Sequence, residues 1–239
     1  MSFTSSIVLL SSGLDSLVSL YWAAVDGQVK LALTFDYGQK AAGPEIRNSS
    51  NVSKSLGIKH QVVKIPWLAK LTKTSLVSRE KEVPQIRQED LKRGDSFFKR
   101  TAKDVWVPNR NAIFINVAAA YAEGLGASRV VAGFYLEEAR SFPDNSREFI
   151  AAAKNLLTWS TLSKVEVFSY LTSMTKVDIV KKGVELGVNW KFLWSCYLGH
   201  NAMCGRCESC SRLISAFNRA GYTYLLPNFD GDQHAVQIS

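Results

Sequence analysis

The sequence lacks any long hydrophobic run and any recognisable targeting segment. The apolar run at residues 7–10 is too short for a signal peptide, and no basic region precedes it. No window approaches the roughly 20 apolar residues that span a membrane. We therefore expect a cytoplasmic protein without a membrane partner.

Acidic residues are also few. The chain has 21 of them against 29 lysines and arginines, which gives a net charge of +8. This charge favours an anionic partner such as a nucleotide, a nucleic acid or an acidic protein, and a merely basic enzyme is an equal alternative. At 46% hydrophobic residues the 239-residue chain is rich enough for a sizeable core, which excludes overall disorder.

Short apolar runs alternate with helical patterns along most of the chain. The patterns predict strands at 5–10, 29–38, 59–65, 128–137 and 164–171, and helices at 15–27, 45–57, 109–126, 147–160 and 175–187. In the last helix Thr175 is the expected N-cap, with Asp178 three residues on. This alternation predicts an α/β fold, a Rossmann-like parallel sheet with helices on both faces.

Charged residues interrupt the alternation. Fourteen of the 26 residues from 79 to 104 are charged, so we expect no core there and a solvated surface insertion within about 70–104. The insertion would belong to a main domain at 1–190. Residues 191–239 would form a C-terminal segment packed on that domain, and its polar tail at 226–239 would lie on the surface.

The segment "SSGLDS" at residues 11–16 joins the first predicted strand to the first predicted helix. Gly13 permits a tight turn, and backbone N–H groups, serine hydroxyls and the helix N-terminus would together favour a phosphate. Asp15 would hold a magnesium ion that bridges phosphate oxygens. The Walker pattern is absent from the sequence. An ordinary Asp or Ser N-cap is the alternative explanation of this loop.

All four cysteines lie in "SCYLGHNAMCGRCESC". They are Cys196, Cys204, Cys207 and Cys210, and the last three form C-x-x-C-x-x-C. Since cytoplasmic thiols stay reduced, two disulfides are not expected, and this spacing favours a closed, structural zinc site with four thiolate ligands. An iron–sulfur cluster and four unligated cysteines are the alternatives. His200 could replace one cysteine as a ligand.

These two motifs together resemble a known family. "LLSSGLDS" resembles the S-G-G-x-D-S signature of PP-loop ATP pyrophosphatases. "FDYGQ", "VPNRNAIF", "FPDNSREF", "MTKVDIV" and "WSCY…CGRCESC" follow in the order typical of 7-cyano-7-deazaguanine synthases, the QueC family. The resemblance runs from residue 7 to about 217.

The resemblance implies a ligase that uses ATP with Mg²⁺. It would adenylate the carboxylate of 7-carboxy-7-deazaguanine, release pyrophosphate and let ammonia form the amide and then the nitrile, as part of queuosine biosynthesis. Zinc would be structural, and a homodimer is expected.

The matching positions imply a set of site residues. The implied catalytic residues are Asp15, Ser16, Arg110 and Lys176. The implied ATP-binding residues are Leu10, Ser11, Ser12, Gly13, Leu14, Asp15, Ser16, Asp36, Tyr37 and Asn111. The implied residues for the deazaguanine substrate are Tyr135, Arg140, Phe142, Asp144 and Glu148. Ordinary structural roles are the alternatives: a turn cap for Asp36, a surface ion pair for Arg110 and a first-turn position for Lys176.

Several positions depart from the family pattern. Ser12 and Asn109 stand where glycine is expected, and a Cβ at Ser12 would crowd the phosphate. "FYLEEARSFPDNSREF" and "KAAGPE" also differ from the expected motifs. These departures leave the acceptor open. A divergent member could join the deazaguanine acid to a protein amine, such as an N-terminus, in anti-phage defence. A tRNA-modifying enzyme and a non-enzymatic zinc scaffold are further alternatives.

Overall fold

A computed structural model describes residues 4–92 and 101–230. In these residues five parallel strands form one sheet in the order β3-β2-β1-β4-β5. The strands are β1 (Ser5–Leu9), β2 (Gln28–Asp36), β3 (His60–Lys64), β4 (Arg129–Val131) and β5 (Glu166–Phe168). The predicted α/β fold is confirmed, although β4 is much shorter than the predicted strand at 128–137.

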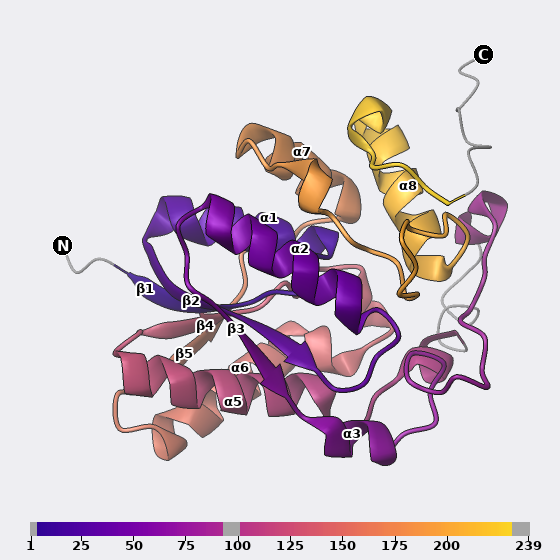
Figure 1. The fold of residues 1–239 in the computed structure, drawn as a ribbon. Coiled ribbons are helices and arrows are strands. Elements are labelled where there is room, and N and C mark those ends of the chain that lie inside the picture. The colour runs from indigo at the N-terminus through magenta and orange to yellow at the C-terminus, as the bar shows by residue number, and fades with distance from the viewer. Residues whose placement is uncertain (1–3, 93–100, 231–239) are drawn as a thin grey trace.

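Helices cover both faces of the sheet (Figure 1). The helices are α1 (Leu14–Asp26), α2 (Ala42–Ser55), α3 (Pro66–Lys70), α5 (Arg110–Leu125), α6 (Arg147–Ser160), α7 (Lys176–Glu185) and α8 (Glu208–Ala220). Short 3₁₀ turns lie at Gln88–Lys92, Glu138–Arg140, Pro143–Asn145, Trp190–Phe192 and Thr223–Leu225. Helices α1, α2 and α7 lie on one face, and α5 and α6 lie on the other (Figure 1). Within 4–92 and 101–230, no helix is long and apolar enough to cross a bilayer.

The central strand β1 contributes to a separate core on each face. Ile7 packs with Leu33 and Ile115 on the α5 side, whereas Val8 packs with Leu17 and Ile179 on the α1 and α7 side. Successive side chains of a strand point to opposite faces, and both faces of this sheet are covered. The strands therefore appear in the sequence as continuous apolar runs rather than as alternating ones.

The strand order produces a crevice at one edge of the sheet. β1 lies between β2 and β4, and the chain passes from β1 through α1 to β2 on one side. The loops that follow β1 and β4 therefore diverge. In open α/β sheets, ligands bind in the crevice outside the carboxyl ends of the strands at such a point.

Helix ends follow the sequence signals closely. Thr175 and Asp178 form a reciprocal capping box at the start of α7, as predicted. Helix α5 ends at Gly126 in the left-handed region, with φ of 65°. Gly126 therefore terminates the helix, at the end of the predicted range 109–126.

The charged segment is not the purely solvated insertion that the sequence predicts. Val83 and Ile86 are buried. Ile86 N donates to the Arg206 carbonyl at 3.3 Å, and Ser211 Oγ donates to the Ile86 carbonyl at 2.7 Å. Two apolar residues between charged ones are enough to anchor this stretch against the cysteine segment. Residues 93–100 and 231–239, including most of the predicted surface tail, lie outside the described residues.

Helix α8, which begins directly after Cys207, is absent from the predicted elements. Its apolar face comprises Leu213, Ile214 and Phe217, at the spacing of a helix that packs on one side. The Phe217 ring meets the Trp190 ring edge to face, with centroids 5.1 Å apart. This contact helps to hold the cysteine segment against the main sheet. The boundary at 190/191 stays a prediction.

Candidate active site

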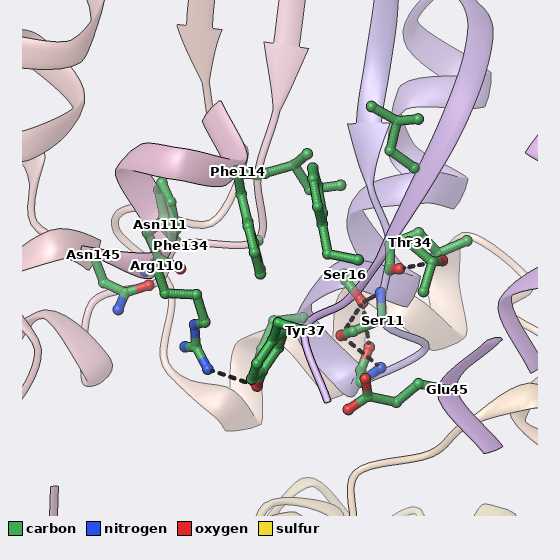
Figure 2. Close-up of a pocket in the computed structure, with 18 of the residues that line it drawn as sticks. Ser11, Ser16, Thr34, Tyr37, Glu45, Arg110, Asn111, Phe114, Phe134 and Asn145 are labelled. Atoms are coloured by element: carbon green, nitrogen blue, oxygen red, sulfur yellow. Dashed lines mark hydrogen bonds between the residues drawn. The ribbon is translucent and has the colours of Figure 1, made fainter. Parts of the chain in front are cut away.

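A first cavity of about 240 Å³ opens at the carboxyl ends of β1, β2 and β4. One part of its wall is apolar, where the Phe35 and Phe114 rings stack with centroids 4.1 Å apart. Figure 2 shows Phe114 and Arg110 on one side of this cavity and Ser11, Ser16 and Glu45 on the other. The cavity therefore joins a flat apolar surface to a polar end.

The polar end is built by the turn from β1 into α1. Gly13 is the N-cap of α1, and no side chain caps the first turn. Ser16 Oγ accepts from Ser11 N at 3.1 Å and donates to the Gly13 carbonyl at 3.1 Å, which holds the turn closed. A Cβ at Gly133 would lie 3.0 Å from the Asp15 backbone, so the loop after β4 reaches this turn. The first-turn N–H groups can therefore receive an anion.

Ser12 adopts the left-handed region, with φ of 59°. Its side chain is fully buried, and its Oγ lies 2.9 Å from Ser49 Oγ on α2. Ser12 is not among the residues that line the first cavity. The expectation that its Cβ would crowd a phosphate is therefore wrong, because the side chain points beneath the loop.

A second cavity of about 180 Å³ adjoins the first. It lies between the loop after β4, the start of α7 and the cysteine segment, and Tyr135, Lys176 and Glu208 are among its lining residues. The residues that line both cavities are Ser11, Gly13, Asp15, Glu45 and Glu138. The two cavities thus meet at the N-terminus of α1.

Asp15 lies at the junction of the cavities with only part of its bonding capacity used. Its Oδ2 is 3.7 Å from Lys176 Nζ, while its Oδ1 is buried without a hydrogen-bond partner. Burial raises the pKa of Asp15, and the charge of Lys176 opposes that shift. A carboxylate oxygen in this position is a suitable ligand for a hard cation such as Mg²⁺.

Two further carboxyl groups at the junction titrate unusually. Burial raises the pKa of Glu45 to about 7 and that of Glu138 to about 7. Gln39 Nε2 donates to Glu45 Oε2 at 2.8 Å. Arg110 Nη1 donates to the Tyr37 hydroxyl at 3.3 Å, which orients the guanidinium in the first cavity (Figure 2).

The four cysteines form one buried cluster. The Sγ atoms of Cys196, Cys204, Cys207 and Cys210 all lie within 4.8 Å of one another. Tetrahedral Zn–S bonds of about 2.3 Å place sulfurs about 3.8 Å apart, so the cluster fits a zinc ion after small adjustments. His200 is exposed and is not part of the cluster.

The structure brings most of the predicted site residues together. Those that line the first cavity are Leu10, Ser11, Gly13, Asp15, Ser16, Tyr37, Arg110 and Asn111. Those that line the second are Ser11, Gly13, Asp15, Tyr135, Phe142, Lys176 and the predicted metal ligand Cys196.

The remaining predicted residues line neither cavity. Ser12 and Leu14 are buried below the loop. Asp36 Oδ1 accepts from Gly38 N at 3.1 Å, as the turn-cap alternative predicts. Arg140 and Glu148 are exposed, and Asp144 contributes its backbone carbonyl to Asn111.

Sequence reasoning missed several residues that line the cavities. They include Glu45, Phe114, Phe134, Glu137, Glu138, Trp194, Tyr197, Glu208 and Arg212. Most lie inside the quoted motifs, so the motifs marked the region. The individual side chains carried no spacing signal of their own.

The queuosine biosynthesis protein QueC family model matches residues 5–221. The chain belongs to the QueC family. This membership confirms the resemblance carried by the loop and cysteine motifs.

Three relatives, each named 7-cyano-7-deazaguanine synthase, are similar to this QueC-family chain over most of both lengths. The protein of Desulforamulus reducens is 48% identical over 91% of this chain and 95% of its own. The protein of Pelotomaculum thermopropionicum is 49% identical over 90% of this chain and 97% of its own length. The protein of Carboxydothermus hydrogenoformans is 50% identical over 88% of this chain and 97% of its own length.

Ser49→Ala should destabilise the protein by about 1–3 kcal/mol, because it leaves the buried Ser12 hydroxyl without its partner. Ser12→Gly in the same chain should recover part of this loss, since glycine has no hydroxyl and accepts a positive φ. Urea denaturation of both single variants and the double variant measures the coupling. The exposed Ser50→Ala is the control, and strictly additive effects would contradict the predicted pairing.

Glu45→Gln should change how stability depends on pH. The folded-state pKa of Glu45 is about 7 against an ordinary 4.5, so its contribution is fully present below 4.5 and is lost as pH rises through 7. Glutamine does not titrate. The variant should therefore match the wild type near pH 5 and exceed its stability near pH 8 by up to about 3 kcal/mol.

Thermal unfolding at several pH values tests this expectation. Glu166→Gln is the matched control, because the Glu166 side chain is half-exposed and lies outside both cavities. Parallel pH profiles for the wild type and Glu45→Gln would show that Glu45 does not titrate near neutrality.

Proposed function

We propose that this chain is an ATP-dependent ligase that converts 7-carboxy-7-deazaguanine into 7-cyano-7-deazaguanine with ammonia as the nitrogen donor. The observation that carries the proposal is the pair of cavities that meet at Asp15 in a chain of the QueC family. The first cavity suits the nucleotide, and the second suits the acid. The relatives' name specifies the nitrile product.

The shape of the first cavity supports a bound ATP. The stacked Phe35 and Phe114 rings offer an apolar surface for adenine. The uncapped first turn of α1 offers N–H groups to the phosphates, and Ser11 and Ser16 offer hydroxyl groups. ATP bound in this orientation would have its α-phosphate at the junction with the second cavity.

Activation of the acid follows from this arrangement. A carboxylate oxygen of the acid attacks the α-phosphorus of ATP, and pyrophosphate leaves. Ammonia then attacks the acyl carbon, and AMP departs with one of the original carboxylate oxygens to leave the amide. The amide oxygen attacks a second ATP in the same way. AMP then departs with the former amide oxygen, and the nitrogen loses both of its protons to give the nitrile.

The side chains at the junction have roles that follow from their charge. Asp15 would hold Mg²⁺, and the ion would neutralise charge on the departing pyrophosphate. Lys176, beside Asp15, would neutralise charge on the acid and on the α-phosphate. Glu138, whose pKa is about 7, lines both cavities and can accept a proton from the incoming nitrogen.

We assign zinc to the four-cysteine cluster as a structural ion. All four ligands would be protein thiolates, so no open position remains for water or substrate. Its role would be to fix the wall that the cysteine segment adds to the second cavity. Such thiolate ligation is consistent with a cytoplasmic enzyme, where thiols stay reduced. The homodimer stays a prediction.

The direct test is pyrophosphate release from ATP with 7-carboxy-7-deazaguanine, with and without ammonium, followed by mass analysis of the products. We expect release that depends on the acid, and accumulation of the nitrile only with ammonium. If the acid is activated but the nitrile never forms, the acceptor is a different amine, such as a protein N-terminus. If ATP is untouched, the assignment of the first cavity is wrong.

Asp15→Asn should lower kcat for pyrophosphate release by at least about 100-fold, because it removes the charged oxygen that would hold the metal ion. Asp104→Asn is the control, since Asp104 is exposed and lines neither cavity. Steady-state kinetics over a range of Mg²⁺ concentrations would reveal the effect. Wild-type activity in Asp15→Asn would remove Asp15 from the mechanism.

Cys207→Ser should abolish stoichiometric zinc and destabilise the fold, since metal binding contributes to folding free energy. Elemental analysis of the purified protein distinguishes zinc from iron, and thermal unfolding measures the loss of stability. One zinc per chain is expected in the wild type. A zinc-free variant with unchanged stability and activity would refute a structural site.

A further inference from the structure

One wall of the second cavity comes from the cysteine segment and contains a buried acidic residue, Glu208. Only 6% of Glu208 is exposed. Its Oε1 accepts from Arg212 Nε at 2.9 Å, and Arg212 Nη2 lies 2.8 Å from the same oxygen in an ion pair. Its Oε2 is buried and has no hydrogen-bond partner among the described residues. The residue is therefore held in place by one oxygen while the other is left unsatisfied.

Unsatisfied atoms are concentrated around this cavity. In the described part of the chain, seven buried side-chain atoms lack a partner, and three of them belong to residues that line the second cavity. They are Asp15 Oδ1, Trp194 Nε1 and Glu208 Oε2. A buried polar atom without a partner costs about 1–3 kcal/mol, so three at one cavity indicate groups kept for a ligand.

The position of Glu208 is fixed by the backbone as well as by Arg212. Glu208 N donates to the Pro84 carbonyl at 2.9 Å, which joins the start of α8 to the charged segment. The neighbouring Ser209 Oγ lies 3.0 Å from Ser195 Oγ, and both serines also line the cavity. Hydrogen bonds of the backbone and of neighbouring side chains therefore fix the position of the Glu208 carboxylate.

We propose that Glu208 recognises the edge of a guanine-type base that carries the ring N1–H and the 2-amino group. That edge presents two parallel N–H donors, and an ionised carboxylate is an acceptor with about four lone-pair sites. Oε2, which has no partner in the described part of the chain, would accept both donors through its two lone pairs, while Oε1 stays engaged by Arg212. This inference rests on the proposed function and names the residue that selects its substrate.

The rest of the cavity agrees with a flat base in this orientation. Tyr135, Phe142, Trp194 and Tyr197 are aromatic lining residues that can pack against a ring. Trp194 Nε1–H is a donor and suits the 6-oxo group of the base. The carboxylate of the acid, on the opposite end of the bicyclic ring, would then face Asp15 and Lys176.

A carboxylate in this position also discriminates against other bases. Adenine presents a ring-nitrogen lone pair where guanine presents N1–H, so it would place acceptor against acceptor. An analogue without the 2-amino group would leave one Glu208 interaction unmade. Sites built to bond a polar group reject analogues that lack it far more strongly than apolar pockets reject a missing methylene.

Calorimetric titration with 7-carboxy-7-deazaguanine and with its analogue lacking the 2-amino group tests the proposal. The wild type should bind the former at least about tenfold more tightly. In Glu208→Gln, affinity for the deazaguanine acid should fall about 10- to 100-fold, because the amide offers only one acceptor oxygen. Affinity for the analogue should fall less, and ATP affinity should stay unchanged. Glu185→Gln, an exposed substitution on α7, is the control.

The outcomes separate this inference from the proposed function. A wild type that binds the acid but not more tightly than the analogue overturns the role of Glu208, as does a folded Glu208→Gln with unchanged discrimination. Zinc content and thermal unfolding establish that the variant is folded. If Glu208→Gln fails to fold, Glu208→Asp replaces it, because aspartate keeps both carboxylate oxygens. Glu208→Asp should bind the acid more weakly but still prefer it to the analogue. The comparison of the two compounds on the wild type tests the role of Glu208 in either case. A wild type that binds neither compound overturns the proposed function itself.

Discussion

The turn at Ser12 is the constraint on which the rest of the site depends. Its left-handed backbone directs the chain from β1 into α1 so that the N-terminus of α1 faces the junction of the two cavities. The Ser12 side chain bonds Ser49 on α2, and its carbonyl accepts from Trp194 N at 2.8 Å. One residue therefore links the central strand, a neighbouring helix and the cysteine segment. A substitution that changed the backbone conformation at Ser12 would therefore disturb the strand, the helix and the cysteine segment together.

The same geometry buries three acidic side chains at the junction, where ionisation is unfavourable. Asp15, Glu45 and Glu138 lie where both cavities meet, and burial raises the pKa of each. Arg110 and Lys176 offset only part of this effect. The ligand-free site is thus less stable than a neutral one would be. A bound nucleotide with its cation would supply the missing partners, which is the usual reason for unsatisfied charge at a functional site.

The C-terminal segment contributes more than the four clustered cysteines. Helix α8 packs against α7, the start of α8 bonds the charged segment through Pro84, and the same segment forms a wall of the second cavity. The four cysteine Sγ atoms lie together next to the start of α8, where Glu208 is the first residue. The cluster and the residue proposed to recognise the substrate therefore share one short stretch of backbone. The buried Val83 and Ile86 anchor the charged segment to this stretch, while the charged Glu82 and Arg87 beside them stay exposed.

The sequence by itself determined the parallel sheet, the anion-binding turn and the cysteine cluster, because these depend on local signals: apolar runs, glycine position and the spacing of cysteines. It also located the capping box at Thr175 and eight of the twenty residues that line the first cavity. Only the tertiary structure decided the direction of individual side chains. Ser12 points beneath its loop, Asp36 caps a turn, and Arg140 and Glu148 face solvent. Glu208 and Trp194 join the second cavity because α8 and the segment before it pack against the loop after β4, and contacts between residues so distant in the chain leave no periodic trace in the sequence.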